Sequence, residues 1–344
     1  CSTLGKCSAG VGADMGLFDA GGDLGDMGDL GPKPDAPDMS MVDSGVNDLS
    51  PDTSLPQDQG VTMDQAVTAD LPDSGNVDAG GGTTWVTITA SKFYMGSTSS
   101  DTCRDSKNES YHEVTLTNNF EIASIELTRA EFYGLMNYSN AKSSGCTSAC
   151  PVEYVSWNEA AAYCNALSTS MSLGSCYTCT GSGTTITCTV DSTYAASGAI
   201  YSCPGYRLPT EAEWEFAARA GSTTALYNGG MVGCTGIDAN ADLIAWYDKN
   251  SSSKAHEVKK KAVNSWGLYD MSGNVMEWTN DVYLEDLGTS SLSNPSGPTT
   301  GTSHTARGGS WSQAASFLRS ASRFKALGTG RGAFLGFRCV RTLP

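Results

Sequence analysis

A change of composition near residue 82 limits how much of this 344-residue chain can fold. Residues 8–82 contain 15 aspartates, no glutamate, one basic residue (Lys33) and one aromatic residue (Phe18). Such a segment cannot bury enough apolar surface to offset the entropy that is lost on ordering. We therefore expect residues 1–82 to be a disordered, extended acidic tether and residues 83–344 to form one domain.

The net charge of -16 is concentrated in that tether. Residues 83–344 carry 19 basic and 22 acidic side chains, which is a net charge of only -3. Because nucleic-acid binding requires a strongly basic surface, we expect no nucleic-acid partner for this nearly neutral domain.

The first residue, Cys1, predicts attachment to a membrane. A cysteine followed by Ser2 is the end that remains when a bacterial lipoprotein signal peptide is cleaved, although arbitrary trimming of the chain is the alternative. No stretch of the sequence is apolar over enough residues to span a bilayer. We therefore expect a lipoprotein of the bacterial cell envelope, in the outer membrane. It would contact the membrane only through an acyl chain on Cys1.

Cysteine content indicates an oxidising compartment, because residues 83–344 contain ten cysteines, enough for five disulfides. Cys176 and Cys179 have the C-x2-C spacing of a zinc site, but no second C-x2-C follows. The polar sequence that leads on to Cys188 and Cys203 is typical of a hairpin. We therefore predict a loop stapled by two nested disulfides, Cys179 with Cys188 and Cys176 with Cys203.

Three S/T-x-x-E patterns predict helices that begin after Thr128, Ser156 and Thr210. The third helix carries glutamates at 211, 213 and 215, which cannot all share one helical face. We interpret these glutamates as surface groups or as partners of the helix dipole, not as a catalytic acid and base.

Two further features, His112 and the turn at Gly273, are candidates for metal binding or catalysis. His112 has no second histidine or aspartate at ligand spacing, so we interpret it as a structural hydrogen bonder. The turn at Gly273 would expose backbone carbonyls near Glu277, and calcium accepts such oxygens. The alternative is a buried glutamate bonded to amide groups of the turn, and the residues alone leave both interpretations open.

Several long motifs occur in a fixed order that resembles the formylglycine-generating enzyme, or sulfatase-modifying factor, family. The resemblance extends over residues 83–342 and implies an α+β fold with little regular secondary structure, related to C-type lectins. Its motifs are MGS (95–97), PVEYVSW (151–157), YRLPTEAEWEFAARAG (206–221), GLYDMSGNVMEW (267–278), RGGSW (307–311), R-x-A-x-R (319–323) and GFRC (336–339).

The resemblance also implies two structural features. Cys164 and Cys339 match the cysteines of the family's structural disulfide. Gly273, Val275 and Glu277 match the residues that hold a calcium ion through two backbone oxygens and a carboxylate. On this basis we expect Ca²⁺ as the one possible cofactor.

Active enzymes of the family oxidise a sulfatase cysteine to formylglycine with copper(I) held by two cysteines, because thiolates suit this soft ion. The matching positions in this chain are Gln313 and Leu318, and no cysteine lies between Cys234 and Cys339 to replace them. We therefore expect no copper and no copper-dependent oxidase activity.

Three functions remain open on the sequence alone. We favour a non-catalytic module that binds a peptide, protein or glycan through residues 312–334, a surface that could be diversified between strains. The alternatives are an oxidoreductase that works without the cysteine pair and an accessory subunit that binds sulfatase-like peptides. We expect Arg319 and Arg323 to pair with acidic residues near Trp278. The candidate ligand-contacting residues are Trp311, Gln313, Leu318, Arg319 and Arg323.

Overall fold

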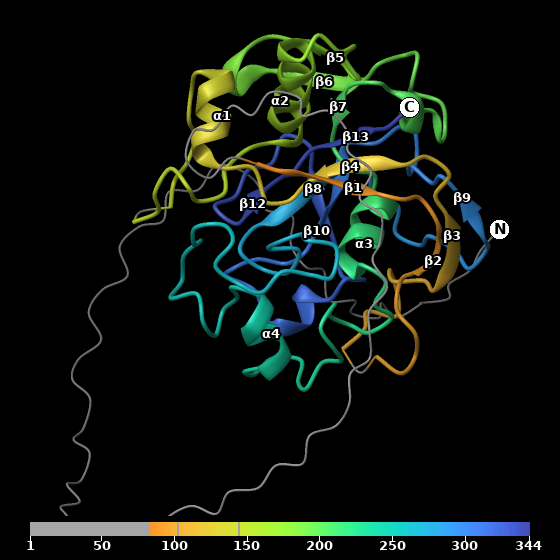
Figure 1. The fold of residues 1–344 in the computed structure, drawn as a ribbon, viewed down its shortest axis with the longest axis vertical. Helices are drawn as coiled ribbons and strands as arrows, with labels where there is room; N and C mark the ends of the chain where they lie inside the picture. The colour runs from red at the N-terminus through yellow and green to blue at the C-terminus, as the bar shows by residue number, and fades with distance from the viewer. Residues whose placement is uncertain (1–82, 102, 144) are drawn as a thin grey trace, which may run out of the picture. The chain divides into compact units, whose positions relative to one another are not determined.

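The structure is a computed structural model that describes residues 83–344 except residues 102 and 144 (Figure 1). The expected tether of residues 1–82, including Cys1, lies outside the described residues. Short strands and helices alternate with long irregular segments, which confirms the predicted α+β fold of low regular content. Among the described residues, no helix is both long and apolar enough to cross a bilayer.

One antiparallel sheet joins the two ends of the described chain. Its strand order is β1 (Trp85–Ile88), β4 (Phe120–Ala123), β13 (Val340–Thr342) and β7 (Tyr206–Arg207). Ile122 pairs with strands on both sides and is fully buried. Pairing on both edges of β4 therefore fixes the end of the chain in the core.

A second sheet contains most of the strands that follow residue 302. Its order is β11 (Arg323–Leu327), β10 (Ser303–Arg307), β8 (Met276–Val282) and β12 (Leu335–Gly336), with β12 parallel to β8. In this register Arg307 of β10 stands opposite Arg323 on one side and Glu277 on the other. The first six residues of β8 are buried, so this sheet lies inside the domain.

The remaining strands form two smaller sheets. One consists of β2 (Lys92–Met95), β3 (His112–Thr115) and β9 (Leu292–Ser293). The other is the hairpin of β5 (Tyr177–Thr180) and β6 (Thr187–Val190). Residues 83–97 are therefore divided between two sheets, because β1 pairs with β4 and β2 pairs with β3.

The three predicted capping boxes are confirmed. Each Thr or Ser accepts the backbone N–H of a glutamate three residues on, and the glutamate side chain accepts the N–H of the cap. Each cap stabilises its helix by about 1 kcal/mol. The helices concerned are α1 (Arg129–Met136), α2 (Trp157–Ser170) and α3 (Glu211–Arg219).

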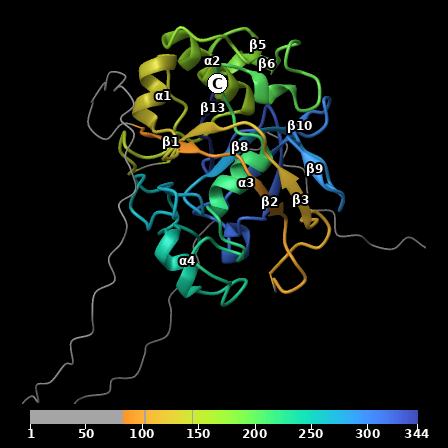
Figure 2. The same cartoon turned by 45° about the vertical axis from the view of Figure 1, so that its right-hand side comes forward.

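The other helices are short. Asp238 caps α4 (Ala239–Ile244) by accepting two backbone N–H groups. Figures 1 and 2 show α1, α2 and the β5 and β6 hairpin at one end of the domain and α4 at the opposite end. The 3-10 helices are η1 (Gly183–Thr185), η2 (Ala199–Ser202) and η3 (Ala315–Leu318).

Four disulfides connect the described residues, as is typical of proteins in exported, oxidising compartments. The predicted nested pair in the polar insertion is confirmed. The bridges are Cys103 with Cys234, Cys146 with Cys150, Cys176 with Cys203, and Cys179 with Cys188.

The fifth pair, Cys164 and Cys339, is in contact but not bonded. Both cysteines are buried as free thiols, with their Sγ atoms 2.7 Å apart. The structure therefore brings together the two cysteines that the family resemblance pairs. It does not contain the bond between them, which stays a prediction.

Candidate functional site

Residues 307–323 begin with a turn that only glycine can make. Gly308 and Gly309 have φ values of +91° and +69°. A Cβ on Gly309 would lie 2.7 Å from the carbonyl oxygen of Phe317, and one on Gly308 would lie 3.1 Å from the indole of Trp214. The turn therefore places the following residues, including η3, in close contact with the rest of the domain.

Leu318 is part of a core instead of a ligand surface. Its side chain is fully buried in a small apolar cluster that also contains Leu226, Ile244 and Tyr247. A leucine that is sequestered in this way cannot contact a ligand. The prediction that Leu318 belongs to a binding surface is therefore wrong, and the reason is the burial of η3 against the segment around α4.

Gln313 is bonded within the fold. Its backbone carbonyl accepts the N–H of Asp248 at 3.0 Å, and its side-chain oxygen accepts the hydroxyl of Ser310 at 3.3 Å. The space beside it, bounded by Arg307, Phe317 and other residues of this segment, has no room for a water molecule. This space, at the place that corresponds to the family's copper positions, is therefore too small to admit a ligand.

Arg319 is buried, with 2% of its surface exposed, and is bonded to carboxylates from the first part of the domain. Both oxygens of Glu109 accept from it at 2.6 Å, and Asp101 accepts at 3.2 Å. Burial acts against its charge, but these carboxylates outweigh burial and raise the pKa of Arg319. Neither partner is near Trp278, so that expectation is wrong for Arg319.

Arg323 is held in a similar way by α3. Its guanidinium donates to both oxygens of Glu211, at 2.5 and 2.9 Å, and to the carbonyls of Asn108 and Leu284. Burial opposes both charges, but their contact raises the pKa of Arg323 and lowers the pKa of Glu211. Only 7% of the surface of Arg323 is exposed and its guanidinium is bonded within the fold, so its prediction as a ligand contact is also wrong.

The three glutamates of α3 are buried ion-pair partners, and their interpretation as surface groups is wrong. Glu213 accepts from Arg207 at 2.7 and 2.8 Å. Glu215 accepts from Arg219 at 2.9 Å and also from Arg307. Arginines from three other segments and Arg219 of α3 itself thus pair with the glutamates of one helix, which the spacing of the glutamates along the sequence did not indicate.

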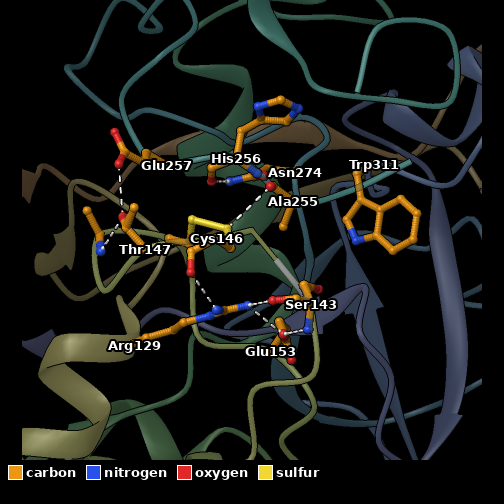
Figure 3. The surroundings of a disulfide bond; sticks show 12 residues. Arg129, Ser143, Cys146, Thr147, Glu153, Ala255, His256, Glu257, Asn274 and Trp311 are labelled. Atoms are coloured by element: carbon orange, nitrogen blue, oxygen red, sulfur yellow. Dashed lines mark hydrogen bonds and ion pairs between the residues drawn. A yellow bond between two sulfur atoms is a disulfide. The ribbon is translucent and has the colours of Figure 1, made fainter. Parts of the chain in front are cut away.

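Trp311 remains partly exposed. Its backbone N–H donates to Asn274 and its indole N–H donates to the carbonyl of Ala333 at 2.9 Å. Trp311 is one of the residues around the bridge between Cys146 and Cys150 (Figure 3). Of the five candidate ligand-contacting residues, Trp311 and Gln313 are partly exposed, and the other three are buried.

The loop with this bridge is held by one arginine. Arg129 donates to the carbonyls of Ser143 and Cys146, at 3.2 and 3.1 Å, and to the carboxylate of Glu153 at 2.7 Å (Figure 3). These contacts fix the shape of the surface beside Trp311.

The expected calcium residues are occupied by other groups. Glu277 accepts from Arg338 through both carboxylate oxygens at 2.7 Å, and from the indole of Trp214 at 2.8 Å. As arranged, these residues do not fit the ion, because a guanidinium lies where a cation would bind. This geometry favours the alternative of a buried glutamate that is hydrogen-bonded within the fold. The calcium site stays a prediction.

Two more carboxylates lie near Glu277. Burial raises the pKa of Asp270 to about 6 and raises the pKa of Glu126 well above its usual range. Glu126 accepts the backbone N–H of Val275 at 2.9 Å. Among the described residues, no group of three or more His, Cys, Asp or Glu side chains is placed to hold a metal ion.

His112 has the structural role that was predicted. It is buried, and its Nδ1 lies 2.8 Å from the carbonyl of Ser110, to which it donates. A different histidine, His304, borders a hollow of about 350 Å³ between the disulfide-stapled insertion and residues 296–301. It stacks on Trp157 at 4.0 Å, and burial lowers its pKa to about 4. His304 is therefore neutral near pH 7.

A larger cleft, of about 550 Å³, lies away from residues 307–318 and was missed by the sequence analysis. We call it the tyrosine cleft. Its walls are β2, residues 96–101, the end of α3 and residues 221–231. The only sequence motif at its edge is MGS, whose Gly96 and Ser97 are among the lining residues. Its side-chain lining includes Lys92, Tyr94, Thr98, Ser100, Asp101, Tyr111, Arg219, Ser222, Thr223 and Thr224.

Comparisons with known proteins show the family. Residues 74–343 match the family model described as the sulfatase-modifying factor enzyme 1-like domain, and the chain therefore belongs to that family. Among curated relatives, formylglycine-generating enzyme of Mus musculus is 30% identical over 201 residues, which are 55% of this chain and 44% of the relative. Chaperone protein LppX of Paenibacillus barcinonensis is 32% identical over 198 residues, 49% of this chain and 65% of the relative.

Another relative is a serine/threonine-protein kinase, pkn1 of Chlamydia caviae, 38% identical over 43% of this chain and 23% of its own length. The chain thus spans less than two thirds of each of these three relatives. Among solved structures, Treponema denticola variable protein 1 has a TM-score of 0.63 and 29% identity, and covers 76% of this chain and 95% of its own. PvdO from Pseudomonas aeruginosa, at TM-score 0.55 and 22% identity over 75% and 94%, shows the fold alone.

Proposed function

We propose that this protein is an exported binding module that does not catalyse formylglycine formation. The observation that carries the proposal is the state of the two positions that match the copper cysteines. Leu318 is buried in an apolar cluster, and the space beside Gln313 has no room for water. Among the described residues the free thiols are Cys164 and Cys339, and both are buried. No thiolate is therefore positioned to hold copper where a substrate could reach it.

Two relatives support a binding role through their names. One is a chaperone protein and the other is a variable protein. A rigid fold that presents side chains from irregular segments suits binding, since the core can stay constant while the surface changes. The four disulfides supply the rigidity and agree with export.

The proposal is tested by incubating the purified protein with a C-x-P-x-R peptide, copper(I) and oxygen, and measuring the peptide by mass spectrometry. We expect the peptide cysteine to remain unchanged, while a formylglycine-generating enzyme assayed in parallel converts it. Formylglycine produced by this protein would refute the proposal directly.

A second candidate function is an accessory role, in which the protein binds a sulfatase-like peptide without oxidising it. The similarity to a chaperone protein favours this candidate. Fluorescence anisotropy with the same labelled peptide tests it without copper. Saturable binding by the unmodified peptide, lost when its cysteine, proline and arginine are replaced by alanine, is the expected result for an accessory subunit.

The prediction of a diversified surface becomes narrower with the structure in hand. In residues 312–334, strain variation is expected only where side chains are exposed, as at Ser312, Phe317 and Lys325, because Leu318 and Arg323 serve the core. Sequencing the gene from several strains tests this. Equal sequence variation at exposed and buried positions of residues 312–334 would contradict this prediction. Variation in this segment that is no greater than in the rest of the chain would also contradict it.

A further inference from the structure

We propose that the tyrosine cleft binds a neutral saccharide. This inference rests on the proposed function, because it names the class of ligand that the binding module takes. It differs from the sequence-based expectation in the position of the site, since the tyrosine cleft is formed mainly by β2, residues 96–101, the end of α3 and residues 221–231, and of residues 312–334 only Ala321 lines it. Four features of the cleft favour such a ligand: an aromatic platform, paired charges, clustered hydroxyls and a rigid frame.

The aromatic platform is formed by Tyr94 and Tyr111. Their rings are stacked, with centroids 4.9 Å apart and planes 9° from parallel. They are 53% and 40% exposed, although large aromatic side chains are usually buried. Neither phenol has a hydrogen-bond partner among the described residues. Because the two rings face each other, the flat apolar surface is the outward face of the stack, against which the C–H face of a sugar ring can pack.

The charges that line the cleft are all paired within the protein. Lys92 pairs with Glu113 at 3.1 Å. Arg219 pairs with Glu215 at 2.7 Å, and Asp101 with Arg319 at 3.2 Å. An ionic ligand would lose part of its hydration in the cleft without gaining a free counter-charge. The charge pattern therefore favours a neutral ligand over a phosphate, a carboxylate-rich peptide or an acidic sugar.

Hydroxyl groups cluster on two walls of the cleft. Thr98 and Ser100 are hydrogen-bonded to each other at 2.6 Å on one wall. Ser222 and Thr224 are bonded at 2.7 Å on another, with Thr223 between them in the sequence. Ser222 and Thr224 donate to the carbonyl of Leu226, so toward a ligand they act as acceptors for the hydroxyls of a saccharide. Side chains that combine an apolar platform with neutral hydroxyls are thus gathered in one cleft.

The frame of the cleft is held in place before any ligand binds. Gly96 donates to Glu215 at 2.9 Å and its carbonyl accepts from Arg219 at 2.7 Å. Its φ is +89°, and a Cβ here would lie 2.3 Å from the carbonyl oxygen of Ser110. Ser97 donates to Glu109, the same carboxylate that binds Arg319. The buried arginine thus supports the cleft through Glu109.

A disulfide also joins two walls of the cleft. Cys103 lies two residues after the lining residue Asp101, and Cys234 lies three residues after the lining residue Met231. Their bond ties the segments together across 131 residues of sequence. Preorganisation of this kind raises affinity, because little conformational entropy remains to be lost on binding.

The test uses the full chain and three neutral oligosaccharides, cellohexaose, maltohexaose and chitohexaose, with hexagalacturonate as the acidic comparison. Saturation-transfer NMR detects binding and titration calorimetry measures Kd. We expect at least one neutral oligosaccharide to bind and hexagalacturonate not to bind. Tyr94→Ala and Tyr111→Ala should each raise Kd by about tenfold or more, since a stacking face is removed.

Tyr133 provides the matched control, because it is 56% exposed on α1 and does not line the cleft. Tyr133→Ala should leave Kd unchanged, and thermal unfolding checks that each variant is folded. Absence of binding by all three neutral oligosaccharides, or binding that survives both cleft substitutions, would overturn the inference. A peptide bound at Tyr94 in their place would also overturn the saccharide class while leaving the binding module intact. Formylglycine production would instead refute the proposed function, so the two failures are distinguishable.

Discussion

Residues 307–323 and the tyrosine cleft differ in sequence signal and in accessibility. The first region carries family motifs, yet Leu318, Arg319 and Arg323 are buried and the space beside Gln313 is closed. The second has only the short MGS motif at its edge, yet it opens a cavity of about 550 Å³ beside exposed tyrosines. The family motifs in residues 307–323 therefore form a structural frame. This frame supports the tyrosine cleft, where we propose that a ligand binds.

The largest expected effect comes from Arg319→Ala, which leaves the carboxylate of Glu109 buried without its counter-charge. We expect the free energy of unfolding to fall by about 3–5 kcal/mol, measured by urea denaturation. Lys92→Ala is the control, because it breaks an exposed ion pair and should cost less than about 1 kcal/mol. An Arg319→Ala protein that is as stable as the Lys92→Ala protein would contradict the assignment of Arg319 to the structural frame.

The next test compares two neighbours in η3. Leu318→Ala removes a fully buried side chain and should lower the free energy of unfolding by about 2–5 kcal/mol. Phe317→Ala changes a side chain that is 39% exposed, so a smaller loss is expected. If the two variants unfold at the same urea concentration, the assignment of Leu318 to a core is wrong.

Acidification probes the side of the molecule that contains β10, because no histidine lines the tyrosine cleft. The folded state holds His304 neutral down to about pH 4, whereas the unfolded chain protonates it near pH 6.5. At His304 the unfolded state therefore binds more protons in this window, and the contribution of His304 to stability falls by about 2–3 kcal/mol as the pH decreases from about 6.5 to 4.

The variant His304→Phe keeps an aromatic ring beside Trp157 and cannot titrate. Its free energy of unfolding should change less with pH over the same window, although its value at pH 7 is lower because the hydrogen bond to Asn280 is lost. Parallel pH profiles for the two proteins would contradict the assignment of this slope to His304.

The smallest expected effect is that of calcium removal. Because Arg338 already neutralises Glu277, chelation with EDTA should shift the Tm by less than about 1 °C. A larger fall that added Ca²⁺ reverses, and that Glu277→Gln abolishes, would support a calcium site at Gly273, Val275 and Glu277 after all.

Local features were predictable from the sequence. The capping boxes at Thr128, Ser156 and Thr210 involve residues three apart, so short-range spacing was sufficient. The nested disulfides of Cys176 and Cys179 also lie within one short insertion. The family motifs predicted the α+β fold, because they record the order of these elements along the chain.

Long-range pairing was not predictable in the same way. Arg319 reaches Glu109 across 210 residues and Arg323 reaches Glu211 across 112. Nothing in the R-x-A-x-R pattern states which carboxylates lie opposite it after folding. The pattern was interpreted as a ligand surface because an arginine that is exposed and one that is buried in an ion pair look alike in sequence.

By itself the sequence determined that residues 83–344 belong to this family, that the domain is disulfide-rich, and that no cysteine stands at 313 or 318. Only the tertiary structure decided which side chains meet solvent. Exposure depends on the segments that pack against a residue, and for Leu318 and Tyr94 those segments are remote in sequence. The binding surface that we propose therefore lies at the tyrosine cleft, where packing leaves space, and not at residues 312–334.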